Sequence, residues 1–340
     1  MSPIEPPALR DVTAEEINAF WRDGAVCLRG IMPESWLALL EEGVQRWLQS
    51  ESRFSLSDFG ASRSDGAAKP KAHFYGGTDH WKTDPACRSF ACDSPLPGIV
   101  GALLRSAKVN LYEDSILVKE PGTLEKTMFH QDLPYFHVEG SQTCTSWVPL
   151  DPVRRETGSL LFVKGSHTWK KMYRPNYFVQ QESMPDTEGE DAPDYHANRK
   201  DAEILCFDME RGDLTVHHAL TLHGALGNGS STLTRRAMSV RYCGDDARYR
   251  IRRGASQKPH HAQIQPGSVL DHPDCPVVWQ RCCAWISDTG RPGWRPAFHG
   301  ASSRPVDLLL CGVAGGPALV PRLRPREPAA ARQDIGMYRK

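Results

Sequence analysis

A histidine and an aspartate two positions apart, His130 and Asp132, lie in the apolar stretch 128–136, MFHQDLPYF. On an extended segment successive side chains alternate between two faces, so these two side chains would point the same way. An imidazole and a carboxylate on one face can bind the same metal ion. A second histidine from a distant strand would complete a two-histidine, one-carboxylate facial triad, which leaves coordination positions open for oxygen chemistry.

The spacing alone does not select this pair, because chance also gives such matches in a chain with 13 histidines and 41 acidic residues. His137 and Glu139 have the same spacing but run into a glycine. His272 and Asp274 enclose a proline in an Asp/Pro-rich turn, which indicates a loop. Only the first pair stands between apolar, strand-like residues with a suitable partner downstream, so its context selects it.

The second histidine is sought in a strand-like run at 214–222 that ends at His223-Gly224. His217, His218 and His223 are the candidates. His217 and His223 are six positions apart and would share a face of an unbroken strand, whereas His218 would face the other way. A lone histidine in a strand is usually structural, but three histidines followed by a glycine turn and an arginine-led strand favour His223.

An arginine near such a site could bind the far carboxylate of a 2-oxo acid. A 2-oxo acid that binds iron through its keto oxygen and one carboxylate leaves its far carboxylate free, and a guanidinium binds that group bidentately. Arg235 continues at alternate positions into Ala237, Ser239 and Arg241, a small and polar face, whereas the face of Arg236 is apolar and suited to packing against helices. We therefore predict Arg235 as the carboxylate clamp, with Arg236 as the alternative and Arg241 as a candidate contact for a substrate anion.

The composition of the whole chain is that of an ordinary globular protein, with 40% hydrophobic and 24% charged residues. Its 41 basic and 41 acidic residues cancel, which argues against nucleic acid or an anionic membrane as the main partner. The start is polar and proline-rich, unlike a secretory signal, and no apolar run approaches a membrane span. The ten scattered cysteines are typical of free thiols in a reducing compartment, so we expect a cytoplasmic protein.

The elements that must position these residues begin with a helical part at about 13–105. Thr13 and Glu16 form a capping-box pattern for a helix that ends before Gly24, and a strand is expected at 25–29. A second helix should start at about Glu34 and carry one apolar stripe, and a third lies at 96–105. Residues 50–71 are rich in Ser, Gly, Asp and Lys and predict a mobile surface loop.

From residue 109 short β-rich segments alternate with turns, a pattern that favours an antiparallel sandwich or barrel of the jelly-roll kind. The expected strands of this core, about 109–245, are 109–118, 127–133, 143–150, 159–163, 203–207, 214–218 and 236–243. Residues 180–195 are acidic and predict a flexible lid or loop. We expect one domain over 1–285 and a Pro/Arg-rich, poorly ordered tail over 286–340.

Taken in order, several short motifs make residues 13–279 resemble the phytanoyl-CoA dioxygenase-like (PhyH) family. They are Phe129-His130-Gln131-Asp132, Trp147-Val148-Pro149-Leu150-Asp151, Gly158-Ser159-Leu160, Gly165-Ser166-His167, Gly212-Asp213, His223-Gly224, Asn228 and Arg235. The resemblance implies a mainly β fold with flanking helices, the double-stranded β-helix of the cupin-like jelly rolls. It also implies an Fe(II)- and 2-oxoglutarate-dependent dioxygenase that uses O2, hydroxylates a small-molecule substrate and releases succinate and CO2.

The resemblance further assigns individual residues. It implies that His130, Asp132 and His223 bind iron, that Arg235 holds the far carboxylate of 2-oxoglutarate, and that Trp147 and Gln131 line the co-substrate pocket. A carboxylate at position 132 favours hydroxylation, because halogenating relatives usually carry Gly or Ala there. Many relatives have serine where this chain has Ala225. Two alternatives stay open: a catalytically silent barrel that only binds, and a metal-dependent hydrolase with Glu139 as its base.

Overall fold

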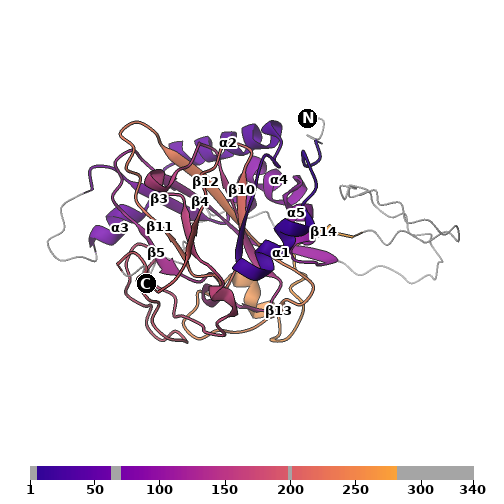
Figure 1. Cartoon of the computed structure of the whole chain (residues 1–340). Coiled ribbons are helices and arrows are strands. Elements are labelled where there is room, and N and C mark those ends of the chain that lie inside the picture. The colour runs from indigo at the N-terminus through magenta and orange to yellow at the C-terminus, as the bar shows by residue number, and fades with distance from the viewer. Residues whose placement is uncertain (1–5, 63–69, 198–200, 282–340) are drawn as a thin grey trace, which may run out of the picture. The chain divides into compact units, whose positions relative to one another are not determined.

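The structure is a computed structural model that describes residues 6–62, 70–197 and 201–281 (Figure 1). The predicted tail at 286–340 lies outside these residues, so its poor order stays a prediction. In the described part of the chain, no helix combines the length and the apolar character needed to cross a lipid bilayer.

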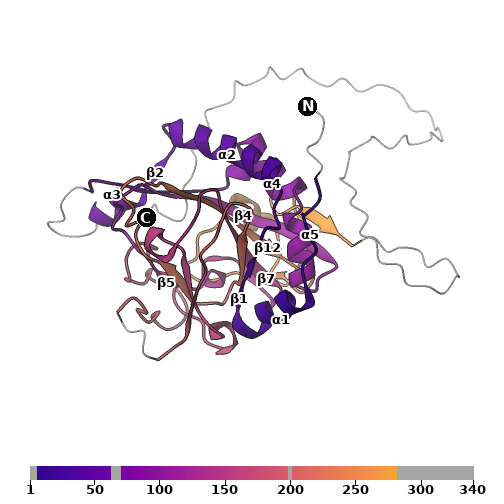
Figure 2. The same cartoon turned by 45° about the horizontal axis from the view of Figure 1, so that its top comes forward.

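Helices cover the outer face of the larger of two main sheets (Figures 1 and 2). The first, α1, begins at the predicted capping box of Thr13 and Glu16 and ends at Gly24, whose left-handed φ of 83° suits glycine. The predicted second helix is also confirmed, with its apolar stripe buried against the sheet. The α-helices are α1 (Ala14–Asp23), α2 (Glu34–Gln49), α3 (Leu56–Ser62), α4 (Pro85–Asp93) and α5 (Leu96–Leu103).

The larger sheet is antiparallel throughout and carries the interior wall of the site. Its order is β1 (Ala25–Leu28), β10 (Leu214–His218), β7 (Thr143–Pro149), β12 (Arg235–Cys243), β4 (Lys108–Lys119), β3 (Phe74–Thr78) and β2 (Phe54–Ser55), with β14 (Val277–Gln280) also pairing with β4. The strands of its centre match the predicted β-rich segments to within a residue or two.

The smaller sheet faces the inner side of the larger one, and the two together form the predicted jelly roll. Its order is β5 (Thr127–His130), β11 (His223–Ala225), β8 (Leu160–Val163) and β9 (Ile204–Cys206). A separate ribbon joins β13 (Arg248–Tyr249) to β6 (Val138–Glu139). Short 3₁₀ helices lie at η1 (His80–Lys82), η2 (Leu133–Tyr135), η3 (Arg155–Thr157), η4 (Ser166–Thr168) and η5 (Pro259–Gln263).

Strand β12 separates packing from chemistry by the alternation of its side chains. Met238, Val240 and Tyr242 point toward the helices and belong to the main hydrophobic core. The residues between them point into the space between the two sheets, as the alternation predicted. The chain thereby offers a polar inner wall without weakening the apolar contact of its sheet with the helices.

Two predictions about local structure are wrong. The expected mobile loop at 50–71 contains β2 and α3 over Phe54–Ser62, because Leu56 is fully buried against Phe74. The prediction failed because it was based on the polar composition of the segment and gave no weight to its apolar residues, which have the spacing of a packed segment. Positions 63–69 are outside the described residues. The strand expected at 214–218 is confirmed, but the longer strand-like run at 214–222 is not one unbroken strand: after a turn the chain crosses to the smaller sheet as β11, so His217 and His223 do not share a strand. Strand β3 and helix α4 were not predicted.

Candidate functional site

Three of the predicted residues, His130, Asp132 and His223, lie together in the space between the sheets. One ligand atom from each lies within 4.8 Å of the others, and all three side chains are buried. The Nε2 atoms of His130 and His223 are 3.4 Å and 3.7 Å from the same oxygen, Oδ1 of Asp132. Among the described residues this is the one group of three or more such side chains close enough to share a metal ion.

The local structure that brings them together differs from the expected one. His130 is the last residue of β5, but Asp132 has left the strand and has helical dihedrals, φ −76° and ψ −42°, at the start of η2. The turn after β5 therefore directs the carboxylate of Asp132 toward the imidazole of His130. The alternation of side chains along a strand, on which the prediction was based, is not the cause. His223 opens β11 and stands directly opposite His130 in the antiparallel pair of β11 and β5. Cross-strand pairing thus supplies the second imidazole.

Both imidazoles are held with Nε2 directed at the shared space. Nδ1 of His130 donates to the carbonyl of Met128 at 2.8 Å, and Nδ1 of His223 donates to the carbonyl of Thr221 at 2.9 Å. A carbonyl can only accept, so each Nδ1 carries the proton and each Nε2 keeps its lone pair for a metal ion. This is the arrangement expected of metal-binding histidines.

The charges in this space also suit a metal. Burial alone would raise the pKa of Asp132, but the surrounding imidazoles, led by His223, hold it well below its usual range. Burial lowers the pKa of His223 and of His217. Near neutral pH Asp132 is therefore an ionised carboxylate and the imidazole of His223 is neutral, the protonation states in which these side chains bind metal ions.

The other oxygen of Asp132, Oδ2, has partners that the sequence did not reveal. The hydroxyl of Thr145, on β7, donates to it, and Nε2 of His217 lies 3.4 Å from it. His217 and Thr145 stand opposite each other on β10 and β7, and both are fully buried. Thr145 therefore holds the carboxylate by a hydrogen bond, and His217 lies close to the same oxygen. Strand alternation from Trp147 could have placed Thr145 on the inner face.

The other predicted candidates for metal binding have different surroundings. Both ring nitrogens of His218 are hydrogen-bonded to backbone groups of Ser141 and Leu220, on the helix side of the sheet. The side chain of Glu139 is 49% exposed and lies 3.5 Å from Arg250, so it does not face the triad. His272 and Asp274 lie 3.6 Å apart but have no third ligand among the residues described.

Arg235 lies on the inner wall of β12 and is 2% exposed. One of its terminal nitrogens donates to the carbonyl of Leu117 at 3.2 Å, and its guanidinium lies 5.5 Å from the ring of Trp147. Nε of Arg235 and Nε1 of Trp147 are buried donors without a partner. Burial lowers the pKa of Arg235 to about 10, so the group stays charged near neutrality. Unpaired buried donors beside a buried charge fit an anionic ligand.

Arg236 and Gln131 are already engaged. The guanidinium of Arg236 binds Asp151 through two nitrogens and lies 2.6 Å from Glu41, on the helix side of the sheet. The amide of Gln131 donates to the carbonyls of Lys171 and Leu220 and accepts from the amide of Tyr173. These contacts favour Arg235 over Arg236 as a clamp and give Gln131 a structural role, in joining two loops.

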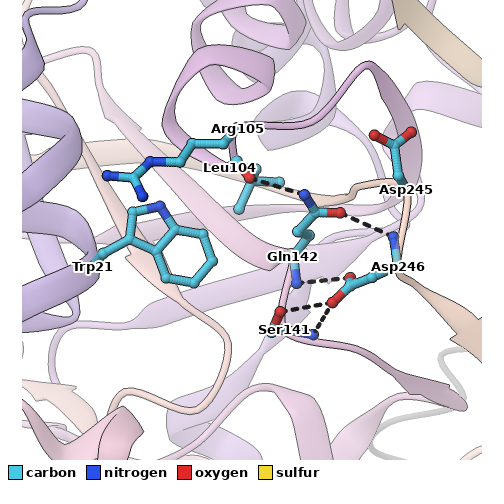
Figure 3. A pocket seen from close by; sticks show the side chains of 7 residues that line it. All are labelled: Trp21, Leu104, Arg105, Ser141, Gln142, Asp245 and Asp246. Carbon is cyan, nitrogen blue, oxygen red and sulfur yellow. Dashed lines mark hydrogen bonds between the residues drawn. The ribbon is translucent and has the colours of Figure 1, made fainter.

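An open hollow of about 500 Å³ lies elsewhere, between the end of α5 and the turns at 141–142 and 245–246 (Figure 3). Its carboxylates have partners within the protein, since Asp246 accepts from the backbone and hydroxyl of Ser141 and Asp245 accepts from the amide of Ala107. None of the triad or of the inner-wall arginines lines it. This hollow is therefore separate from the triad and from the inner-wall arginines.

Comparison with known proteins finds similar chains. The family model described as phytanoyl-CoA dioxygenase (PhyH) matches residues 20–237. The peroxisomal phytanoyl-CoA dioxygenase of Homo sapiens is 27% identical over 147 residues, which is 42% of this chain and 42% of the human protein. The chain thus matches less than half of the length of that curated relative.

Two solved structures show the same fold. The non-heme alpha-ketoglutarate-dependent carbocyclase SnoK from nogalamycin biosynthesis is 24% identical, with a TM-score of 0.61 over 81% of this chain and 100% of its own. EctD from S. alaskensis, solved with 2-oxoglutarate and 5-hydroxyectoine, is 17% identical, with a TM-score of 0.53 over 79% of this chain and 92% of its own.

Proposed function

The chain belongs to the phytanoyl-CoA dioxygenase family, and we propose that it is an Fe(II)- and 2-oxoglutarate-dependent dioxygenase. The finer proposal is that it hydroxylates an unactivated C–H bond of a small molecule with O2 as co-substrate and releases succinate and CO2. The observation that carries the proposal is the buried group of His130, Asp132 and His223, with a buried arginine, Arg235, on the same inner wall.

We assign the ligand roles to the three triad residues. Two lone pairs on Nε2 atoms and one anionic oxygen suit Fe(II), and binding on one side only leaves positions free. Iron and 2-oxoglutarate bound there would supply the activation of O2 for C–H oxidation. Arg235 would hold the far carboxylate of 2-oxoglutarate, with Trp147 as a further donor through its free Nε1. The burial of all these groups would exclude water.

Which product the proposed reaction gives depends on the residues of the site. Asp132 supplies an anionic ligand, which favours hydroxylation in this family over halogenation. SnoK is a carbocyclase, so the fold alone does not decide which product C–H activation leads to. A silent binding barrel would have no need of a complete ligand set with its proton positions fixed, and a hydrolase would need a base that Glu139 does not supply.

The test is a metabolite screen with protein purified without oxygen and supplied with Fe(II) and 2-oxoglutarate, in which succinate is quantified and products are weighed by mass spectrometry. We expect succinate formation that one substrate stimulates, with a product heavier by one oxygen atom. Chelation should stop turnover, and Fe(II) but not Zn(II) should restore it. Asp132→Ala should abolish turnover while Glu139→Ala, a surface carboxylate seven residues further on, should not. Full turnover in Asp132→Ala would remove the assigned ligand set.

A further inference from the structure

A second buried arginine, Arg241, faces the same inner space, level with the metal-binding group. It stands opposite Thr145 on β7 and Glu113 on β4, and Thr145 stands opposite His217 on β10. Because Thr145 and His217 both face Asp132, Arg241 lies in the cross-strand row nearest to the triad. Arg235 lies six residues away on the same strand face, roughly 20 Å at about 3.3 Å per residue.

The guanidinium of Arg241 has far fewer partners than its burial requires. The residue is 8% exposed, and its one hydrogen bond is to the hydroxyl of Ser115. Its Nε is buried without a partner. An arginine offers five N–H donors, and a buried donor left unpaired destabilises the folded protein. A ligand atom that accepts from this group would remove the cost.

Glu113 does not explain the placement of Arg241 as an ordinary ion pair. The nearest atoms of the two are 3.8 Å apart, beyond hydrogen-bond distance. Glu113 instead binds Lys258, whose Nζ lies 2.8 Å from its Oε2 and 3.0 Å from Asp79. Burial raises the pKa of the neighbouring Asp114 to about 8, so this carboxyl group adds no full charge near neutrality. The guanidinium of Arg241 therefore lies near Glu113 but forms no hydrogen bond with a carboxylate.

The backbone and the neighbouring side chains of Arg241 resemble those of an active-site residue. The register of β12 against β4 shifts between Arg241 and Tyr242, and such bulges often re-aim a side chain beside an active site. Its guanidinium lies 6.0 Å from the ring of Phe136, at the end of the segment that carries the triad's carboxylate. Arg241, Phe136, Leu133 and Ala219 border a small gap of about 10 Å³ beside the guanidinium.

We propose that Arg241 binds a carboxylate of the substrate, which makes small carboxylic acids, rather than acyl thioesters or neutral metabolites, the substrate class of this site. The inference rests on the proposed function and adds the substrate to it. A single planar guanidinium matches one carboxylate bidentately. The apolar side chains beside it, Leu133, Phe136 and Tyr112, would pack against the hydrocarbon part of the acid. Arg235 would then hold the co-substrate and Arg241 the substrate, from two levels of one strand.

The test uses full-length protein loaded without oxygen with Fe(II) and saturating 2-oxoglutarate, so that Arg235 is occupied. Octanoate, octanamide, phenylacetate and phenylacetamide are each titrated in a calorimeter. We expect each acid to bind at least about tenfold more tightly than its amide, because a charge-assisted hydrogen bond replaces a neutral one. Arg241→Gln should reduce the acid-to-amide ratio to about one, and Arg241→Lys should retain part of it.

Arg236→Gln is the matched control, since this arginine is on the opposite face of the same strand, and it should keep the wild-type ratio. Equal binding of acids and amides by the wild-type protein, absence of acid binding, or an unchanged ratio in Arg241→Gln would overturn the proposal. If Arg241→Gln does not fold, the acid-to-amide affinity ratios of the wild-type protein and of Arg241→Lys are compared instead, and equal ratios would overturn the proposal. Failure of the underlying function would show earlier, as no Fe(II)-dependent binding of 2-oxoglutarate before any acid is added.

Discussion

Replacing Thr145 by valine should weaken metal binding although Thr145 is not itself a ligand. Valine has nearly the shape of threonine, so the change removes one hydroxyl and leaves no cavity. That hydroxyl donates to Oδ2 of Asp132, and both groups are buried. A hydrogen bond to a buried charged group contributes about 1.5–3 kcal/mol. After its loss, the nearest partner of Oδ2 is Nε2 of His217 at 3.4 Å.

The lost energy divides between two measurable quantities. Part is lost from the folded metal-free protein, and part from the orientation of Asp132 that the metal requires. Loss of an outer partner of a metal ligand typically costs about 10- to 100-fold in affinity. We expect Fe(II) affinity in oxygen-free calorimetry to fall about tenfold, and the free energy of unfolding in urea to fall by about 1–2 kcal/mol.

Two further variants make this test specific. Thr145→Ser keeps the hydroxyl and should bind metal within about threefold of the wild-type protein. Thr143→Val, two residues earlier on the same face, removes a hydroxyl whose acceptor is the carbonyl of Gly140 at 3.5 Å, and it should leave metal affinity unchanged. If Thr145→Val kept wild-type affinity and stability, the hydrogen bond to Asp132 would not hold the carboxylate, and the role given to Thr145 would be wrong.

The remaining predictions concern three other positions. Arg235→Ala should raise the 2-oxoglutarate concentration needed for half-maximal succinate formation far more than Arg236→Ala does. Arg236→Ala should mainly lower stability in urea, because it removes contacts to Asp151 and Glu41. The reverse order of the two effects would assign the carboxylate clamp to Arg236. Ala225→Ser adds a hydroxyl in the same cluster as Trp147 and should tighten 2-oxoglutarate binding about fivefold in calorimetry, which corresponds to about 1 kcal/mol. Unchanged or weaker binding would show that a hydroxyl at this position does not contact the co-substrate. His80 is buried without a hydrogen-bond partner, and burial lowers its pKa from 6.5 to about 4, so the unfolded chain binds its proton more readily and stability should fall by about 2–3 kcal/mol as pH drops from 7 to 4.5. His80→Phe should flatten that part of the urea-measured pH profile, and an unchanged profile would assign the loss to other groups.

The sequence predicted best where a residue's role depends on its own strand. The alternation along 235–243 separated Arg235 from Arg236 correctly by face, because side-chain direction in a strand depends on position parity alone. The capping box at Thr13 and the glycine that ends α1 are equally local, and both are confirmed. The motifs also identified the family, since their order along the chain is more specific than any one of them.

Prediction failed where the cause lies in another part of the chain. Thr145 looks like any threonine of a β-strand, and only the fold places Asp132, 13 residues earlier, against its hydroxyl. His217 and His223 were compared as members of one strand, but they lie in different sheets that face each other. Leu56 was assigned to a loop because its polar neighbours outweighed it, whereas its burial comes from Phe74 on β3.

The two faces of β12 imply that substitutions along it should sort by parity. Changes at Met238, Val240 or Tyr242 remove contacts of the main core, where a large-to-small substitution typically costs about 2–5 kcal/mol, and they should act on stability. Changes at Arg235, Ser239 or Arg241 alter the inner wall and should act first on what the site binds, because these side chains do not join that core. A variant series along the strand should therefore alternate between loss of stability and loss of binding. A series in which both properties fell together at every position would show that the sheet does not separate packing from chemistry.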